Sequence, residues 1–350
     1  MEPFSGIPHD DLLKLVFSIA VLLATARLLG EVMRRIGQPV IVGELLAGVL
    51  LGPAFLATVF PAFGRLIVPQ TQAQSQLLDV VGLIGIMLLI LVVGMETDLA
   101  LIRVHARAAV SIGSMGFVIP FGFGLAVARV FPDDLVGETS SRLMFALFLS
   151  VALALSAIPV LAKILSDLRM LRSRFGQIAL AAGMFDDILG WTALGIVTSL
   201  AAAGRFSIVG VGQTVGSLVV FFAASYWLAR PLARLALRFI QDRTRMSDGL
   251  LSLLVVFAFA WGAFSQALHL EPVLGAFVAG VIFARQRRLP RSVGRRLESM
   301  TMGIFAPIFL AIAGLRLQVE IFSQADLLAL TLLLVAVASI GKLVGAFIGA

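Results

Sequence analysis

Long apolar stretches alternate with short polar segments along the whole chain of 350 residues. Eleven such stretches can be distinguished, and most hold the roughly 20 residues that a helix needs to cross a bilayer. They cover residues 11–29, 38–58, 77–97, 106–131, 143–166, 174–200, 207–238, 248–268, 271–285, 298–318 and 325–350. Backbone polar groups in lipid must bond within their own segment, so the pattern predicts an all-α polytopic membrane protein.

Composition agrees with this prediction. The chain is 60% hydrophobic and only 13% charged, whereas soluble domains are about 25% charged. It has no cysteine, which excludes disulfides and thiolate-bound haem or metal. The first residues are acidic and lack a basic region and a small-residue cleavage site, so we expect the first stretch to be retained. Since no nucleophile–base pair or metal-ligand spacing is recognisable, we expect neither an enzyme nor a cofactor.

The net charge of +7 is distributed unevenly among the loops. The loops with few basic residues contain only Arg65, Arg129, Arg142, Arg205 and Arg316. Most of the 27 lysines and arginines lie in the alternate loops, at Arg34, Arg35, Arg103, Arg107, Lys163, Arg169, Arg172, Arg174, Arg230, Arg234, Arg238, Arg243, Arg245, Arg285, Arg287, Arg288, Arg291, Arg295 and Arg296. Basic residues favour the cytoplasmic side. The distribution therefore predicts an external N-terminus and an eleventh span that ends inside, and we do not interpret the charge as nucleic-acid binding.

Two short motifs recur in the same order. GELLAGV at 43–49 and GAFVAGV at 275–281 share a glycine, an alanine, a second glycine and a valine at an offset of 232 residues. The next apolar stretch ends in Gly94-Met-Glu in one case and Gly314-Leu-Arg in the other. The two copies run in opposite directions across the predicted membrane, as in secondary transporters built from inverted repeats.

The repeat predicts how the single domain, residues 1–350, is organised. A first repeat covers about 11–200, a linker span covers about 207–238, and a second repeat begins at about 248. The second repeat has no counterparts for the last two spans of the first. We therefore expect an incomplete transporter, with a finished eleven-span protein as the alternative.

Asp186 and Asp187 lie in the middle of the apolar stretch from Ile178 to Leu200. A charge at the centre of a bilayer costs ~2.5 to 3.5 kcal/mol on insertion scales. We therefore expect the two aspartates to bind something positive: a proton, a metal cation or a buried lysine. Adjacent residues on a helix point about 100° apart, so one can face a water-filled cavity and the other a neighbouring helix. The alternative is a solvated helix end at 183–187.

Three other features could contribute to such a site. The run Ser156, Ala157, Ile158, Pro159 predicts a broken helix, because proline removes a backbone donor; an ordinary kink is the alternative. Lys342 lies in the last apolar stretch and needs a partner. Asp186 or Asp187 is the obvious candidate, and snorkelling to the cytoplasmic surface is the alternative. We interpret Glu44 as a hydrogen-bonded structural acid and expect Glu96 to reach the cytoplasmic interface.

Several of these segments together resemble one family. They are QPVIVGELLAGVLLGP at 38–53, LVVGMETDL at 91–99, FDDILG at 185–190, LGAFVAG at 274–280 and PIFLAIAGL at 307–315. As a set, and in this order, they resemble the sodium/hydrogen exchanger domain of the monovalent cation:proton antiporter-2 family. The resemblance extends over about residues 11–350.

The resemblance implies thirteen spans, of which about eleven are present. It also implies a dimerisation domain, a core domain with two broken helices crossing at the ion site, and a homodimer that works by an elevator motion. The ion-binding aspartate of the family falls on Asp187 and the preceding aspartate on Asp186. The lysine that pairs with it falls on Lys342, and the first broken helix on Ser156 to Pro159. The second crossing helix and a nucleotide-binding regulatory domain have no counterpart.

The hypothesis that follows is secondary-active antiport of H⁺ against Na⁺ or K⁺, with Asp187 binding proton and monovalent cation alternately. Oxygens of the broken span suit a hard cation. Two alternatives remain open: a ligand-gated K⁺ efflux system resembling a channel on the same scaffold, and a non-transporting membrane sensor or assembly protein that keeps Asp186 and Lys342 as a structural pair.

Overall fold

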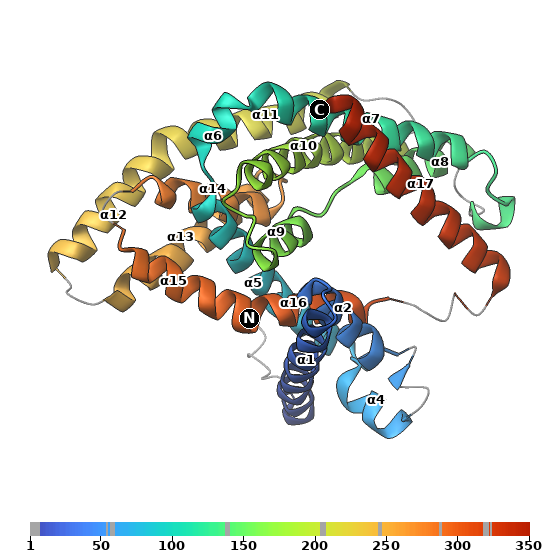
Figure 1. Ribbon diagram of the computed structural model, residues 1–350, viewed down its shortest axis with the longest axis horizontal. Coiled ribbons are helices and arrows are strands. Elements are labelled where there is room, and N and C mark those ends of the chain that lie inside the picture. Colours follow the sequence, from blue (N-terminus) through green and yellow to red (C-terminus); the bar gives the residue numbers. More distant parts are fainter. Residues whose placement is uncertain are drawn as a thin grey trace.

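The computed structural model describes residues 8–53, 55–56, 60–136, 141–203, 208–243, 247–286, 289–317, 322 and 324–350. Throughout these ranges the regular structure is helical (Figure 1). The helices are α1 (His9–Arg35), α2 (Val40–Leu51), α4 (Pro61–Ile67), α5 (Gln72–Glu96), α6 (Leu99–Val104), α7 (Ala106–Val127), α8 (Arg142–Ala154), α9 (Ile158–Asp167), α10 (Arg174–Ala203), α11 (Ile208–Ala224), α12 (Arg230–Arg243), α13 (Ser247–Ala267), α14 (Pro272–Ala284), α15 (Arg291–Met300), α16 (Ala306–Leu315) and α17 (Ala325–Gly349). Short π-helical turns join α11 to α12 and α15 to α16.

The helices coincide in order with the predicted apolar stretches. In the described ranges, nine helical segments are long and apolar enough to cross a membrane. The two remaining stretches, 38–58 and 271–285, hold the shorter apolar helices α2 and α14. The all-α prediction is therefore confirmed, while the number of segments that cross a bilayer stays a prediction.

The central helix is α5, whose residues from Met87 to Gly94 are all buried. It packs against α14, α16, α13 and α9, and it passes through the middle of the bundle in Figure 1. A helix that is apolar on every side is stable only when other helices or lipid surround it. The apolar sequence of α5 thus accounts for its central place.

Helices α2 and α14 approach a preceding helix in the same way. At Gly43, an added Cβ would come under 3.0 Å from the Leu29 carbonyl of α1. At Gly275, which is 232 positions later, a Cβ would meet the Trp261 carbonyl of α13 equally closely. Only a residue without a side chain allows this separation.

A second contact of each short helix follows the same spacing. Gly48 of α2 lies against the Ala311 carbonyl of α16, and Gly280 of α14 lies against the Leu91 carbonyl of α5. The predicted repeat pairs α1 with α13, α2 with α14 and α5 with α16. The packing is thus reciprocal, because α2 contacts α16 of the second predicted unit and α14 contacts α5 of the first.

A further group consists of α7, α8, α9, α10 and α17. Helix α7 packs against α8, α10 and α17, and Figure 1 shows α17 running beside α7 and α8. Gly341, Gly345 and Gly349 form a stripe along α17, where the α7 backbone comes close. This close packing fixes the position of Lys342, the residue next to the first glycine.

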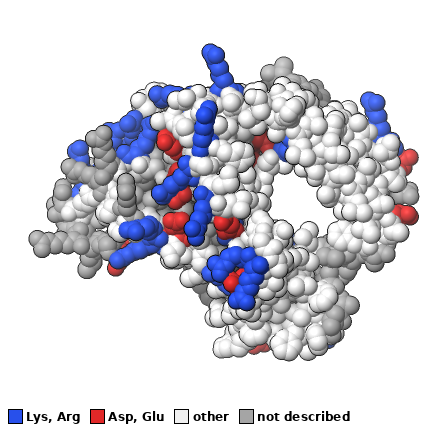
Figure 2. Space-filling model, in the orientation of Figure 1, with Lys and Arg blue, Asp and Glu red and all other residues white. Residues whose placement is uncertain are grey.

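Charged residues are concentrated on part of the surface. Figure 2 shows Lys, Arg, Asp and Glu gathered on the left and centre of one face, whereas the rim of the opening at the right is almost entirely uncharged. Some of the charged side chains form exposed ion pairs, such as those of Glu31 with Arg34 and Arg35 at the end of α1.

Candidate functional site

The helix that begins at Arg142 is interrupted in its middle. Helix α8 ends at Ala154 and α9 begins at Ile158. Between them the backbone is extended, with φ −61° and ψ 140° at Leu155 and φ −95° and ψ 94° at Ala157. Pro159 lies in the first turn of α9, where its missing N–H has no cost. The predicted break is thus a true interruption, with two half-helix ends facing each other.

Lys342 of α17 reaches into this interruption. Its Nζ atom donates hydrogen bonds to Ser156 Oγ at 2.7 Å, to Asp186 Oδ2 at 2.9 Å and to the Ala154 carbonyl oxygen. Ala154 is the last residue of α8, and a cation is favourable at a helix C-terminus because the carbonyl ends carry partial negative charge. All three donors of the ammonium group are used, and the group is directed into the bundle, so the snorkelling alternative does not apply.

Asp186 and Asp187 lie on α10 in different surroundings. Asp186 is 3% exposed and forms the ion pair with Lys342. Its second oxygen, Oδ1, has no hydrogen-bond partner in the part of the chain described above. Asp187 is partly exposed and, among the same residues, makes no hydrogen bond or ion pair. The adjacent carboxylates therefore have different surroundings, as their angular separation on the helix predicted: Asp186 is paired with α17, and Asp187 is not.

Glu271 is a further charged residue near Asp187, and the sequence analysis did not identify it. It occupies the N-cap position of α14, and its charge acts on that of Asp187. Because Glu271 lies at the boundary of a predicted apolar stretch, nothing in the local sequence distinguished it from a solvated loop residue.

A second group of buried charges lies where α2 meets α9. Glu44 is fully buried, Lys163 is 3% exposed, and Lys163 Nζ donates to Asp167 Oδ1 at 2.7 Å. The interpretation of Glu44 as a hydrogen-bonded acid was wrong, because neither of its oxygens has a hydrogen-bond partner in the described structure. Counting Lys163 with the cytoplasmic loops was also wrong. Lys163 lies on the buried face of the amphipathic helix α9. It was assigned to a loop because it lies close to the end of the predicted stretch 143–166.

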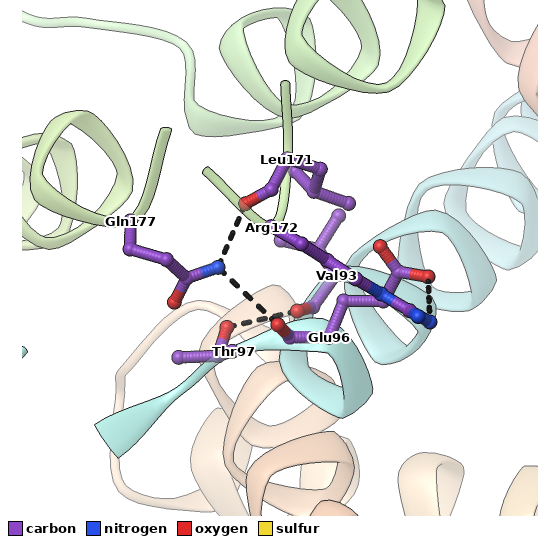
Figure 3. Close-up of polar contacts among 6 residues, drawn as sticks. All are labelled: Val93, Glu96, Thr97, Leu171, Arg172 and Gln177. Carbon is purple, nitrogen blue, oxygen red and sulfur yellow. Dashed lines mark hydrogen bonds and ion pairs between the residues drawn. The ribbon is translucent and has the colours of Figure 1, made fainter. Parts of the chain in front are cut away.

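Glu96 lies at the end of α5, where it was expected near an interface. It forms an ion pair of 3.0 Å with the exposed Arg172. Figure 3 shows the neighbouring contacts, in which Gln177 Nε2 donates to the carbonyl oxygens of Leu171 and Glu96. Gln177 Oε1 in turn accepts from the backbone N–H of Asp98. These bonds fasten the start of α10 to the end of α5.

A cavity of about 610 Å³ adjoins these contacts. Its lining includes Glu96, Arg172, Arg295 and Glu298, but neither Asp186 nor Asp187. In the described ranges no group of three or more His, Cys, Asp or Glu side chains could hold a metal ion. The cavity and the aspartates beside the interrupted helix are thus separate features of the structure.

Comparison with known proteins agrees with this geometry. The family described as "Sodium/hydrogen exchanger, transmembrane" matches residues 19–350. This chain belongs to the sodium/hydrogen exchanger family. The resemblance to monovalent cation:proton antiporters that the motifs indicated is thereby confirmed.

Two curated antiporters are similar in sequence to this chain. It is 29% identical over 335 residues to K(+)/H(+) antiporter 1 of Saccharomyces cerevisiae, covering 93% of this chain and 38% of that protein. It is 28% identical over 341 residues to Na(+)/H(+) antiporter NhaS4 of Synechocystis, covering 97% of this chain and 82% of that protein. The chain therefore spans well under half the length of the yeast relative.

A solved structure shares the fold. The sodium proton antiporter MjNhaP1 from Methanocaldococcus jannaschii aligns with a TM-score of 0.67 at 15% sequence identity, covering 97% of this chain and 79% of that one. At this level of identity the similarity establishes the fold alone.

Proposed function

We propose that this chain exchanges H⁺ for a monovalent cation, Na⁺ or K⁺, across a membrane, and that Asp187 binds the two alternately. The observation that carries the proposal is the distribution of charge at the interrupted helix. Lys342 donates to Asp186, Ser156 and the end of α8, and the carboxylate of Asp187 has no hydrogen-bond or ion-pair partner among the residues that the structure describes. An intramembrane carboxylate in this position needs a positive ligand.

A single carboxylate can couple the two fluxes. A proton and a cation both neutralise Asp187, so binding of one releases the other. The interrupted segment from Leu155 to Ala157 supplies carbonyl and hydroxyl oxygens outside a regular helix, and such ligands suit a hard cation. Asp186 remains paired with Lys342 and adds no net charge while that pair is intact.

The packing supports alternating access by movement of two bodies. One consists of α1, α2, α5, α13, α14 and α16, and the other of α7, α8, α9, α10 and α17. We propose that the second body, which carries Asp187, moves as an elevator against the first. The reciprocal glycine contacts support an inverted repeat, and a homodimer in a bacterial-type inner membrane with an external N-terminus completes the proposal.

The test is cation-dependent proton flux in proteoliposomes after a pH jump. The exchanger carrying Asp187→Asn should lose this flux. Asp326→Asn provides the matched control, because Asp326 is an exposed residue in the first turn of α17 and should leave the flux intact. Undiminished flux in Asp187→Asn would refute the assignment.

Two other results would select other functions. Electrogenic cation flux without proton movement would indicate a channel-like efflux system on the same scaffold. Cation binding that displaces no proton and moves no ion would indicate a sensor or assembly protein.

A further inference from the structure

The contact between α2 and α9 contains a carboxylate that the exchange site does not use. Glu44 is fully buried, and both of its oxygens lack hydrogen-bond partners in the described part of the chain. A buried ionised carboxylate without hydrogen bonds is costly, and the usual resolution is that it takes up a proton. Glu44 is therefore unlike a structural acid, whose oxygens would be satisfied.

The only charged group of the described residues within ion-pair distance of Glu44 is already occupied. Lys163 Nζ lies 2.7 Å from Asp167 Oδ1 but 3.7 Å from Glu44 Oε2, which is beyond a hydrogen bond. Glu44, Lys163 and Asp167 together would carry one net negative charge if all were ionised. A proton on Glu44 brings the buried group to neutrality.

The charges that face Glu44 come from two neighbouring helices. Helix α9 contributes Lys163 and Asp167, and α1 contributes Arg27, whose charge acts on Glu44 at longer range. Helix α16, which also packs against α2, has no charged residue. Glu44 is the only charged residue of α2 itself. Lys163 is thus the cation that an ionised Glu44 would attract most strongly.

We propose that Glu44 is a second proton-binding site, separate from Asp187, and that its proton controls a latch between α2 and α9. When Glu44 is protonated, Lys163 stays with Asp167 on its own helix, as in this structure. When Glu44 is ionised, it draws Lys163 across the contact and ties α9 to α2. The role as a latch rests on the proposed function, because α2 and α9 belong to the two bodies that would move against each other.

Infrared difference spectroscopy tests the proton site without any transport. The carboxylic C=O stretch of Glu44 should be present at acidic pH, disappear on alkalinisation, and be absent in Glu44→Gln. Glu31→Gln is the matched control, because Glu31 is a more exposed residue near the end of α1, paired with surface arginines. The band should persist in Asp187→Asn, so the result does not depend on whether Asp187 transports ions.

The latch is tested by the pH profile of cation-dependent proton flux. Glu44→Gln should retain flux at alkaline pH where the unmodified protein slows by about tenfold, a factor that corresponds to about 1.4 kcal/mol. Glu31→Gln should follow the unmodified profile. An unchanged profile in Glu44→Gln, despite a titrating band, would overturn the latch.

Three further outcomes decide the proton site. Identical spectra of the unmodified protein and Glu44→Gln at every pH would overturn it, because Glu44 would then stay ionised. A shift of the band on addition of Na⁺ or K⁺ at constant pH would also overturn it, since the site would take a cation. If Glu44→Gln fails to fold, Lys163→Met replaces it: loss of the cation should move the titration of the band to higher pH, and an unmoved titration would contradict the proposal.

Discussion

Replacing Lys342 by methionine should destabilise the protein through Asp186. The change removes the ammonium group that donates to Asp186, Ser156 and the end of α8. It leaves a carboxylate that is 3% exposed and whose two oxygens have no other hydrogen-bond partner among the described residues. Removing one partner of a buried ion pair costs about 3–5 kcal/mol. Lys342 itself is 30% exposed, so we expect a loss of about 3 kcal/mol, at the lower end of this range.

A double-mutant cycle separates the charge effect from lost packing. Thermal unfolding in detergent is measured for Lys342→Met, Asp186→Asn and the combination of both. The combined variant should be more stable than Lys342→Met alone, because no unpaired charge remains at position 186. A combined variant no more stable than Lys342→Met would refute the reasoning.

Two further predictions concern packing. Gly280→Ala should lower the unfolding temperature by several degrees, because its Cβ would collide with the α5 backbone; Gly216→Ala, where nothing lies within 4 Å, should be neutral or slightly stabilising. Gln177→Leu should cost about 1–3 kcal/mol for each backbone group left unsatisfied and should accelerate hydrogen exchange where α10 begins, as mass spectrometry of that segment would show. Unchanged exchange in Gln177→Leu would mean that these bonds do not hold α10 to α5.

The aspartate couplet illustrates what could be predicted. Hydropathy identified Asp186 and Asp187 as unusual because the cost of a charge in lipid is a property of one position and its immediate neighbours. The α-helical period alone then showed that the two side chains must face different surroundings. Which of them is paired could not be deduced, because that depends on the rotation of α10 against α17.

The cluster at α2 and α9 illustrates what could not be predicted. Glu44 and Lys163 are 119 positions apart in the printed chain, and Lys163 lies close enough to a segment end to be taken for a loop residue. Only the packing of α9 against α2 places the two charges 3.7 Å apart.

The sequence by itself determined the helical membrane class, the order of the helices, a helix break or kink at Pro159 and the position of the intramembrane carboxylates. Each of these follows from a local quantity, namely hydropathy, helical period or the missing N–H of proline. The tertiary structure decided which charges neutralise one another, because partnership between helices depends on close approach at glycines such as Gly345 and Gly43. Lys342 could be suspected as a partner, but only the position of α17 showed that it pairs with Asp186, while Asp187 has no ion-pair partner in the described ranges.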